Sequence, residues 1–323
     1  MTLKIRLAVR DWDYLTPMIL GDVSSSTLSV EVDRVSTMPV EIGGASPYNA
    51  GEASFSRHLT GLAQGESETV AVPNFLMRGF RHACIITRKD SPLTTIEALA
   101  GKRIGVTGWQ DSGNTWTRAI LRHAGVMTDD VAWYAGRLTA DHPIQDRLGT
   151  FHQPGRIEAM PDEEPMMDSL ARGWLDAVFT PFMPTGFFAP DSEFRQLLPD
   201  CRSAQVAYFH DVGYVPGIHL LTVDRSLVEA EPWVPQELSD LIDRSRAMWT
   251  EKRRRYAETT PFMLDEMLYT ARSLPASWDA SGVEANRKMT SDFIGQMHDQ
   301  AILPRLLSVE DVFGAAEEAR KIA

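Results

Sequence analysis

The feature that most constrains the fold is an alternation of short strand-like segments with longer helical ones. Apolar and polar side chains alternate with the period of a strand over residues 3–9, and a helix is predicted to begin near Ser54 and end at Gly65. Strands that alternate with helices build sheets covered by helices on both faces, so the pattern predicts an α/β protein. Further strands are predicted at 27–35, 70–72, 83–87, 102–106, 131–134, 177–179, 206–209 and 219–223, and further helices at about 114–123, at 166–173 and in most of the chain after residue 232.

The length of the chain, 323 residues, favours two lobes of ordinary domain size over one small core. Hydrophobic residues make up 43% and charged residues 24%, which is typical of globular proteins. Residues 137–165 contain Gly and Pro and few apolar side chains, and they are predicted to form a long loop. Because ligands bind at the carboxyl ends of the strands in such sheets, functional residues are expected in the strand-to-helix turns.

The net charge of −12 narrows the range of partners. Nucleic-acid backbones and anionic membrane surfaces attract basic proteins, so binding to either is not expected. A few arginines inside a cleft can still attract a small anionic ligand, because they set the local field. No stretch of the sequence is apolar over the length that a membrane span needs.

The motifs in the sequence predict neither a metal nor a cofactor. The two cysteines, Cys84 and Cys201, form no zinc motif, and the sequence leaves a disulfide between them open. Phosphate-binding, dinucleotide-binding and nucleophile-elbow motifs are missing from the sequence. Residues 1–10 enter a strand without the apolar stretch of a secretory signal, so a cytoplasmic location is expected if this is the native start.

A polar turn followed by the start of a helix, residues 108–116, is the first candidate anion site. Backbone N–H groups and the positive end of a helix favour an anion at such a point. The alternative is an ordinary helix start with two core tryptophans. The side chains in this segment that could donate hydrogen bonds or stack on a ring are Trp109, Gln110, Ser112, Asn114, Thr115 and Trp116.

Two arginines and a histidine, Arg78, Arg81 and His82, precede a predicted buried strand. Guanidinium groups bind carboxylates through two parallel hydrogen bonds, so the arginines are candidates for a carboxylate clamp. The imidazole of His82 is a candidate for proton transfer near neutral pH. The alternative is a basic turn on the surface.

Glu52 and His219 are further candidates for proton transfer. Glu52 could act as a base or pair with an arginine, while Ser54, with Ser56 close behind it, fits the N-cap of the predicted helix. His219 begins a predicted strand, where a histidine held by hydrogen bonds for purely structural reasons is an equally good interpretation.

Taken together, these segments resemble the 4,5-dihydroxyphthalate decarboxylase family, a branch of the type 2 periplasmic-binding-protein fold. The matching segments follow the family's order over about three quarters of the chain. They are Asp11–Tyr14, Glu52–Ser56, Arg78–His82, Gly101–Val106, Gln110 with Trp116 and Arg118, Gln153–Arg156, Gly173–Ala177 with Pro181, Gly213–His219 and Pro232–Val234.

The resemblance implies two hinged lobes, residues 1–88 with 219–323 and residues 89–218. Each lobe is expected to contain a doubly wound sheet, with two crossover strands between the lobes and a helical C-terminal tail. The candidate residues above, with Asp11 and Arg118, are implied to face one interlobe cleft that holds a small anionic aromatic acid. Charged residues common in the family are missing near Gly108, Pro181 and Val212, which favours a substrate with fewer carboxylates or a less polar ring.

The resemblance also implies an enzyme, a decarboxylase of a hydroxylated aromatic acid. The aromatic ring can act as the electron sink, so the chemistry requires no cofactor. Under this hypothesis His82 or His219 protonates the ring carbon, and Glu52 or the other histidine takes the phenolic proton. Two alternatives stay open: a non-catalytic solute-binding protein for a small organic anion, and another lyase on the same fold. A homo-oligomer is a further open alternative.

Overall fold

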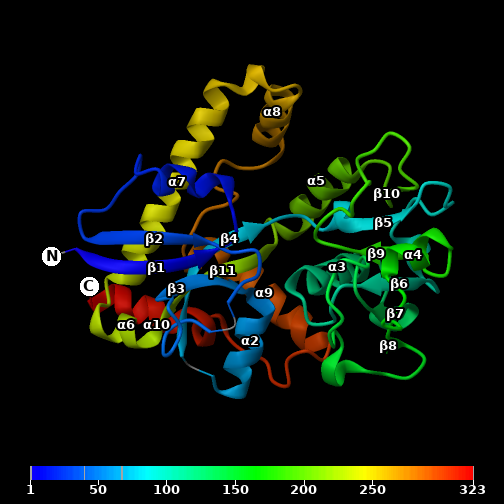
Figure 1. The fold of residues 1–323 in the computed structure, drawn as a ribbon, viewed down its shortest axis with the longest axis horizontal. Helices are drawn as coiled ribbons and strands as arrows, with labels where there is room; N and C mark the ends of the chain where they lie inside the picture. The colour runs from blue at the N-terminus through cyan, green and yellow to red at the C-terminus, as the bar shows by residue number, and fades with distance from the viewer. Residues whose placement is uncertain (1, 40, 67, 323) are drawn as a thin grey trace. The chain divides into compact units, whose positions relative to one another are not determined.

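The computed structural model describes residues 2–39, 41–66 and 68–322, and the chain forms two compact units (Figure 1). The first unit consists of Met1–Arg78, Gly217–Ile294 and Arg305–Ala323, and the second of Gly79–Pro216 and Gly295–Pro304. The lobes predicted from the sequence have other boundaries, above all at residues 295–304, which group with the second unit.

The first unit contains a five-stranded mixed sheet in which β11 lies between β3 and β4 (Figure 1). β1 pairs in parallel with β2 and β3, whereas β11 pairs antiparallel with β3 and β4. A strand from late in the chain therefore completes a sheet begun by the N-terminal segment. The strands are β2 (Leu28–Arg34), β1 (Leu3–Val9), β3 (Ala50–Ser54), β11 (Gly217–Asp224) and β4 (Thr69–Arg78), in sheet order.

Helices of the first unit bury the apolar side chains of this sheet. Alternate residues of β1, such as Leu7, join a core with Leu238 and Leu241 of α7, and Phe55 of α2 stacks on Phe293 of α9 at 4.6 Å. The predicted helical C-terminal region is confirmed. The helices are α1 (Thr16–Ile19), α2 (Phe55–Gln64), α6 (Arg225–Ala230), α7 (Val234–Arg255), α8 (Met263–Ser273), α9 (Val283–Asp299) and α10 (Val309–Ile322), with 3-10 turns η1 (Asp13–Leu15) and η6 (Ala257–Thr259). The residues of α9 from Gly295 onward group with the second unit.

The second unit contains a six-stranded mixed sheet in the order β10-β5-β9-β6-β7-β8 (Figure 1). The strands β9, β6, β7 and β8 run parallel, while β5 and β10 are antiparallel to their neighbours. The strands are β5 (Ile85–Arg88), β6 (Arg103–Val106), β7 (Ala132–Ala135), β8 (Ile157–Ala159), β9 (Ala177–Phe179) and β10 (Phe194–Gln196). The helices are α3 (Ser112–His123), α4 (Met166–Ala171) and α5 (Cys201–Val212), with 3-10 turns η2 (His82–Cys84), η3 (Glu97–Leu99), η4 (Thr128–Asp130) and η5 (Gly149–Phe151).

Three local predictions are wrong. The apolar run at 206–209 lies inside α5, not in a strand, because Asp200 caps the helix through the backbone N–H of Ser203 and Gly213 ends it in the left-handed region. The predicted loop at 137–165 contains β8, which pairs with β7. The strand predicted at 70–72 extends to Arg78, so this arginine ends a strand and does not lie in a turn.

Both cysteines are buried free thiols. None of the described helices combines the length and the apolar character that crossing a membrane requires. Across residues 2–39, 41–66 and 68–322, no three histidine, cysteine or carboxylate side chains converge as a metal site would need.

Candidate functional site

A buried carboxylate–histidine pair lies in the first unit, on the neighbouring strands β3 and β11. The register of these strands places His219 opposite Ser54 and Leu221 opposite Glu52. Nδ1 of His219 lies 2.5 Å from Oε1 of Glu52. The Glu52 side chain is 0% exposed and that of His219 is 11% exposed, so the histidine is the member of the pair that solvent or a ligand can reach.

The second carboxylate oxygen of Glu52 is held by two donors that follow β1. Oε2 accepts the backbone N–H of Arg10 at 2.9 Å and the indole N–H of Trp12 at 2.8 Å. Both donors direct a hydrogen at Oε2. The other carboxylate oxygen, Oε1, is the one that can accept the Nδ1–H of His219.

This geometry leaves Nε2 of His219 as the atom that can exchange a proton. In the part of the chain that the structure describes, Nε2 has no hydrogen-bond partner. A neutral imidazole with its proton on Nδ1 can act as a base through Nε2, and the imidazolium can act as an acid through the same atom. The hydrogen bond to Glu52 orients the imidazole, which is an arrangement suited to proton transfer.

Other predicted residues near this strand end have structural partners. Ser54 occupies the N-cap position of α2, and its Oγ lies 3.1 Å from Oγ of Ser56. Asp11 is exposed, and its carboxylate forms an ion pair with Arg34 at 3.2 Å. The structure therefore gives Asp11 a partner within the protein, and its assignment to substrate binding stays a prediction.

Arg78 is bonded within the first unit. Its Nη2 donates to Oδ1 of Asn286 and, over 3.3 Å, to the carbonyl of Ala280, while the guanidinium lies 4.8 Å from the centre of the Phe75 ring. Burial lowers the pKa of Arg78 to about 10, and the nearby Arg246 acts in the same direction. These contacts indicate an anchor for the start of α9, and the predicted pairing of Arg78 with Arg81 in one clamp stays a prediction.

Arg81 belongs to the second unit and is 3% exposed. Its buried Nε has no hydrogen-bond partner, and no ion pair involves its guanidinium among the described residues. Burial lowers the pKa of Arg81, and the neighbouring Cys84 and Asp111 oppose the effect. Of the predicted arginines, Arg81 is thus the one whose guanidinium has neither a hydrogen bond nor an ion pair among the described residues.

His82 differs from His219 in having no carboxylate partner. It is 3% exposed, its Nδ1 is buried without a partner, and its ring centre lies 5.3 Å from that of Tyr208. Burial lowers the pKa of His82 to about 4, and the charge of His123 adds to this effect. At neutral pH His82 is therefore uncharged, which makes it a weaker candidate for a proton donor than His219.

The side chains predicted to bind an anion at the start of α3 form bonds within the protein instead. Nδ2 of Asn114 donates to the carbonyl of Gly108 at 2.8 Å, and Oγ1 of Thr115 donates to the carbonyl of Asp111 at 3.1 Å. Ser112 is 2% exposed, and Gln110 lies on the surface. The ligand-binding role predicted for these side chains stays a prediction, and the backbone N–H groups of the helix start are a further candidate for binding an anion.

The predicted stacking and binding residues further along α3 belong to the core. Trp109 packs edge-on against Trp133 at 5.8 Å, and Trp116 is 1% exposed beside Tyr214. Arg118 is 1% exposed and donates to Oε1 of Gln300 and to the carbonyl of Trp109, both at 2.6 Å. Burial lowers the pKa of Arg118 to about 9. The substrate-binding role predicted for these three residues stays a prediction.

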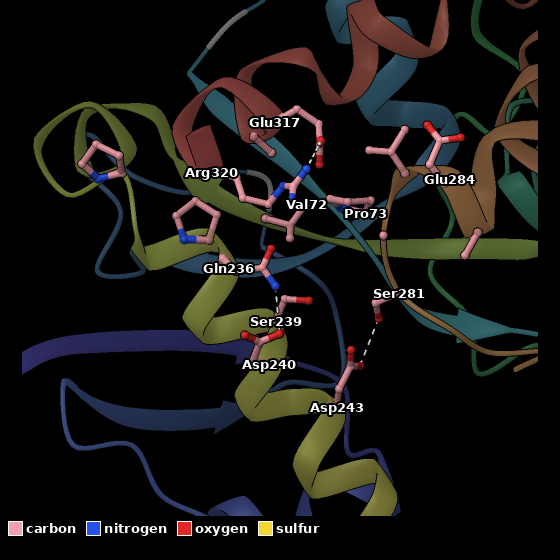
Figure 2. Close-up of a pocket in the computed structure, with 16 residues that line it drawn as sticks. Val72, Pro73, Gln236, Ser239, Asp240, Asp243, Ser281, Glu284, Glu317 and Arg320 are labelled. Atoms are coloured by element: carbon pink, nitrogen blue, oxygen red, sulfur yellow. Dashed lines mark hydrogen bonds and ion pairs between the residues drawn. The ribbon is translucent and has the colours of Figure 1, made fainter. Parts of the chain in front are cut away.

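A cavity of about 330 Å³ lies elsewhere in the first unit, beside α7 (Figure 2). Neither Glu52 nor His219 lines it. Its acidic groups have partners: Glu317 pairs with Arg320 at 2.9 Å, and Asp243 accepts from Ser281 at 3.0 Å (Figure 2). The cavity is therefore not assigned to the candidate site.

Comparison with known proteins adds a sequence relationship. The chain is 27% identical to a 4,5-dihydroxyphthalate decarboxylase of Comamonas testosteroni, over 97% of both chains. It is 28% identical to the enzyme of that name from Pseudomonas putida, over 66% of this chain and 83% of that one. This chain is similar in sequence to 4,5-dihydroxyphthalate decarboxylases. The resemblance predicted from the sequence is confirmed, and the NMT1/THI5-like family model also matches residues 74–146.

Solved structures confirm the fold. The alkanesulfonate-binding protein SsuA from Xanthomonas axonopodis pv. citri matches with a TM-score of 0.55 and 15% identity, over 97% of both chains. The periplasmic aliphatic sulphonate binding protein SsuA from Escherichia coli matches with a TM-score of 0.55 and 13% identity, over 96% of this chain and 91% of that one. The predicted periplasmic-binding-protein fold is therefore correct. That residues of both units face one cleft stays a prediction.

Trp12, Asn286 and Gln300 are the functional and anchoring partners that sequence reasoning missed. Trp12 lies in a segment that carries the family resemblance, but nothing in the pattern indicates that its N–H binds Glu52. Asn286 and Gln300 lie more than 180 residues from the arginines that they bind, and no local signal connects them.

Proposed function

We propose that this protein decarboxylates a hydroxylated aromatic carboxylic acid of the kind that 4,5-dihydroxyphthalate represents. The observation that carries the proposal is the Glu52–His219 pair, in which a buried carboxylate fixes Nδ1 of an accessible histidine. The names of the two relatives, one of which aligns over 97% of the chain, support the reaction class.

The proposed reaction starts from a hydroxyl group para to a carboxylate. Loss of the phenolic proton moves electron density to the ring carbon that carries the carboxylate. The Nε2–H of the His219 imidazolium protonates this carbon, the bond to the carboxylate breaks, and carbon dioxide leaves as its electron pair restores the aromatic ring. Reprotonation of the phenolate and of His219 completes the cycle, so one proton is consumed for each carbon dioxide released. The ring accepts the electrons throughout, and the reaction needs no cofactor.

In this proposal Glu52 is a positioning residue and His219 the catalytic one. Both oxygens of Glu52 are engaged in hydrogen bonds, so the carboxylate acts by orienting the imidazole and stabilising its charge. His82, uncharged at neutral pH, serves as a hydrogen-bonding group and not as the acid.

The test is carbon dioxide release from a matched set of acids by the purified protein. The set contains 4,5-dihydroxyphthalate, 4-hydroxylated benzoates, and phthalate and benzoate as controls that lack the para hydroxyl. Release from the para-hydroxylated acids with none from the controls is the expected result. Absence of release from every acid would contradict the proposal.

A non-catalytic solute-binding role is the second candidate, and the solved structures favour it. Both SsuA proteins are named as binding proteins, and they match this chain over nearly its whole length. A rise in melting temperature with a hydroxylated acid, in the absence of carbon dioxide release, would establish this role instead.

A further inference from the structure

The second unit contains a buried arginine, Arg81, next to the first turn of α3. The N-cap side chain of this helix forms no hydrogen bond to the backbone N–H groups of that turn. Arg81 is 3% exposed, and the described part of the chain provides no hydrogen bond to its Nε and no ion pair. Burying a charge without a partner is costly, so such groups are expected to pair with an anion. The neighbours of Arg81 indicate where that anion would lie.

Gly113 brings the guanidinium of Arg81 against the first turn of α3. A Cβ atom placed on Gly113 would lie 3.0 Å from Nη2 and 3.2 Å from Cζ of Arg81. That is closer than almost all real contacts of a Cβ atom, so glycine is the residue that allows this approach. The helix has 12 residues, enough for a developed dipole, and its first turn carries N–H groups without intrahelical acceptors.

The N-cap residue Asp111 turns away from those N–H groups. An N-cap aspartate normally accepts from the second or third residue of its helix, but here no such bond forms. Oδ2 of Asp111 accepts instead from Oγ1 of Thr107 at 3.1 Å. The N–H groups of Gly113 and Asn114 thus have no acceptor in the described structure, although Asn114 is only 2% exposed. A buried helix end left in this state favours an anion.

The geometry points to a subsite for one carboxylate, formed by Arg81 and the backbone N–H groups of Gly113 and Asn114. A planar guanidinium and two adjacent N–H groups match the two oxygens of a carboxylate. The charge of Asp111 lies near Arg81 and partly offsets it, so the subsite favours a single negative charge over a dianion such as phosphate. The choice of an aromatic carboxylate as the ligand rests on the proposed function, whereas the anion subsite itself does not.

The test measures binding by the full chain, independently of turnover. Benzoate, phthalate and inorganic phosphate are titrated calorimetrically against the wild type and the variants Arg81→Gln and Gly113→Ala. Arg122→Gln is the matched control, because Arg122 lies on the same helix and is paired with Asp299. We expect benzoate to bind more tightly than phosphate, and both variants to weaken benzoate binding by about tenfold or more while the control does not.

The unliganded melting temperature separates this role from a structural one. Replacing a buried cation that lacks a counter-ion should leave the melting temperature of Arg81→Gln unchanged or raise it, whereas loss of a structural arginine would lower it. Wild-type affinity for benzoate in both variants, or no benzoate binding by the wild type, would overturn the subsite. Binding without carbon dioxide release would contradict the proposed function and leave the subsite standing. Carbon dioxide release that is unaffected by Arg81→Gln would contradict the subsite and leave the proposed function standing.

Discussion

The indole nitrogen of Trp12 lies 2.8 Å from Oε2 of Glu52, the carboxylate oxygen that does not contact His219. Trp12 therefore donates a hydrogen bond to the same buried carboxylate that holds a histidine on the neighbouring strand. These hydrogen bonds connect the turn after β1, through Glu52, to His219, whose Nε2 would transfer a proton. Trp12 itself need not touch a ligand.

Replacing Trp12 by Phe should reduce turnover and leave substrate binding nearly unchanged. The substitution keeps a ring that can stack on Tyr14, whose centroid is 6.4 Å away, but removes the N–H that holds the Glu52 carboxylate in place beside His219. We expect kcat to fall about tenfold or more with little change in KM, as measured by steady-state carbon dioxide release.

Trp233→Phe is the matched control for this variant. Trp233 donates its indole N–H to Glu231 at 2.7 Å, so the control removes the same type of bond without touching Glu52 or His219. Equal losses of kcat in the two variants would show that Trp12 acts only through stability.

His82 should make the protein less stable as the pH falls below neutrality. Its pKa in the folded state is about 4, below the ordinary value of 6.5, so the unfolded chain binds the proton more tightly. The contribution of uncharged His82 to the free energy of unfolding is fully present above pH 6.5 and is lost as the pH falls toward 4. At pH 4 the loss amounts to about 3 kcal/mol. Urea unfolding of the wild type and His82→Gln at several pH values between 4 and 7 measures this loss. The two stability curves should diverge in their pH dependence, with the wild type falling more steeply, and parallel curves would contradict the prediction.

Removing the hydrogen-bond acceptor of a buried arginine should lower the free energy of unfolding by more than removing that of an exposed arginine. Gln300→Leu leaves Nε of Arg118, which is 1% exposed, without its acceptor and should lower the free energy of unfolding by about 1–3 kcal/mol. Asp299→Asn, one residue away, weakens an exposed pair with Arg122 and should lower it by less than about 1 kcal/mol. Urea unfolding compares the two, and equal losses would show that the buried bond contributes no more than the surface pair.

The local pattern predicted most of the strands and named both members of the central pair, but it could not predict that they pair. Glu52 and His219 are 167 residues apart, and their contact depends on the register between β3 and β11. Arg78 and Arg81 are close in the sequence, which suggested one clamp. The chain passes from one compact unit to the other between them, and the clamp stays a prediction. The strand predicted at 206–209 failed because apolar content outweighed the cap residues Asp200 and Gly213.

Single-turnover release of carbon dioxide by His219→Gln, with the para-hydroxylated acid that the wild type converts fastest, tests whether His219 transfers the proton. His58→Gln is the control, since His58 also lies in the first unit and its buried Nε2 has no hydrogen-bond partner among the described residues. We expect His219→Gln to release carbon dioxide at a rate lower by on the order of 100-fold or more, with substrate still bound and His58→Gln close to the wild type. A rate for His219→Gln within about twofold of the wild type would show that the Glu52–His219 pair does not transfer the proton.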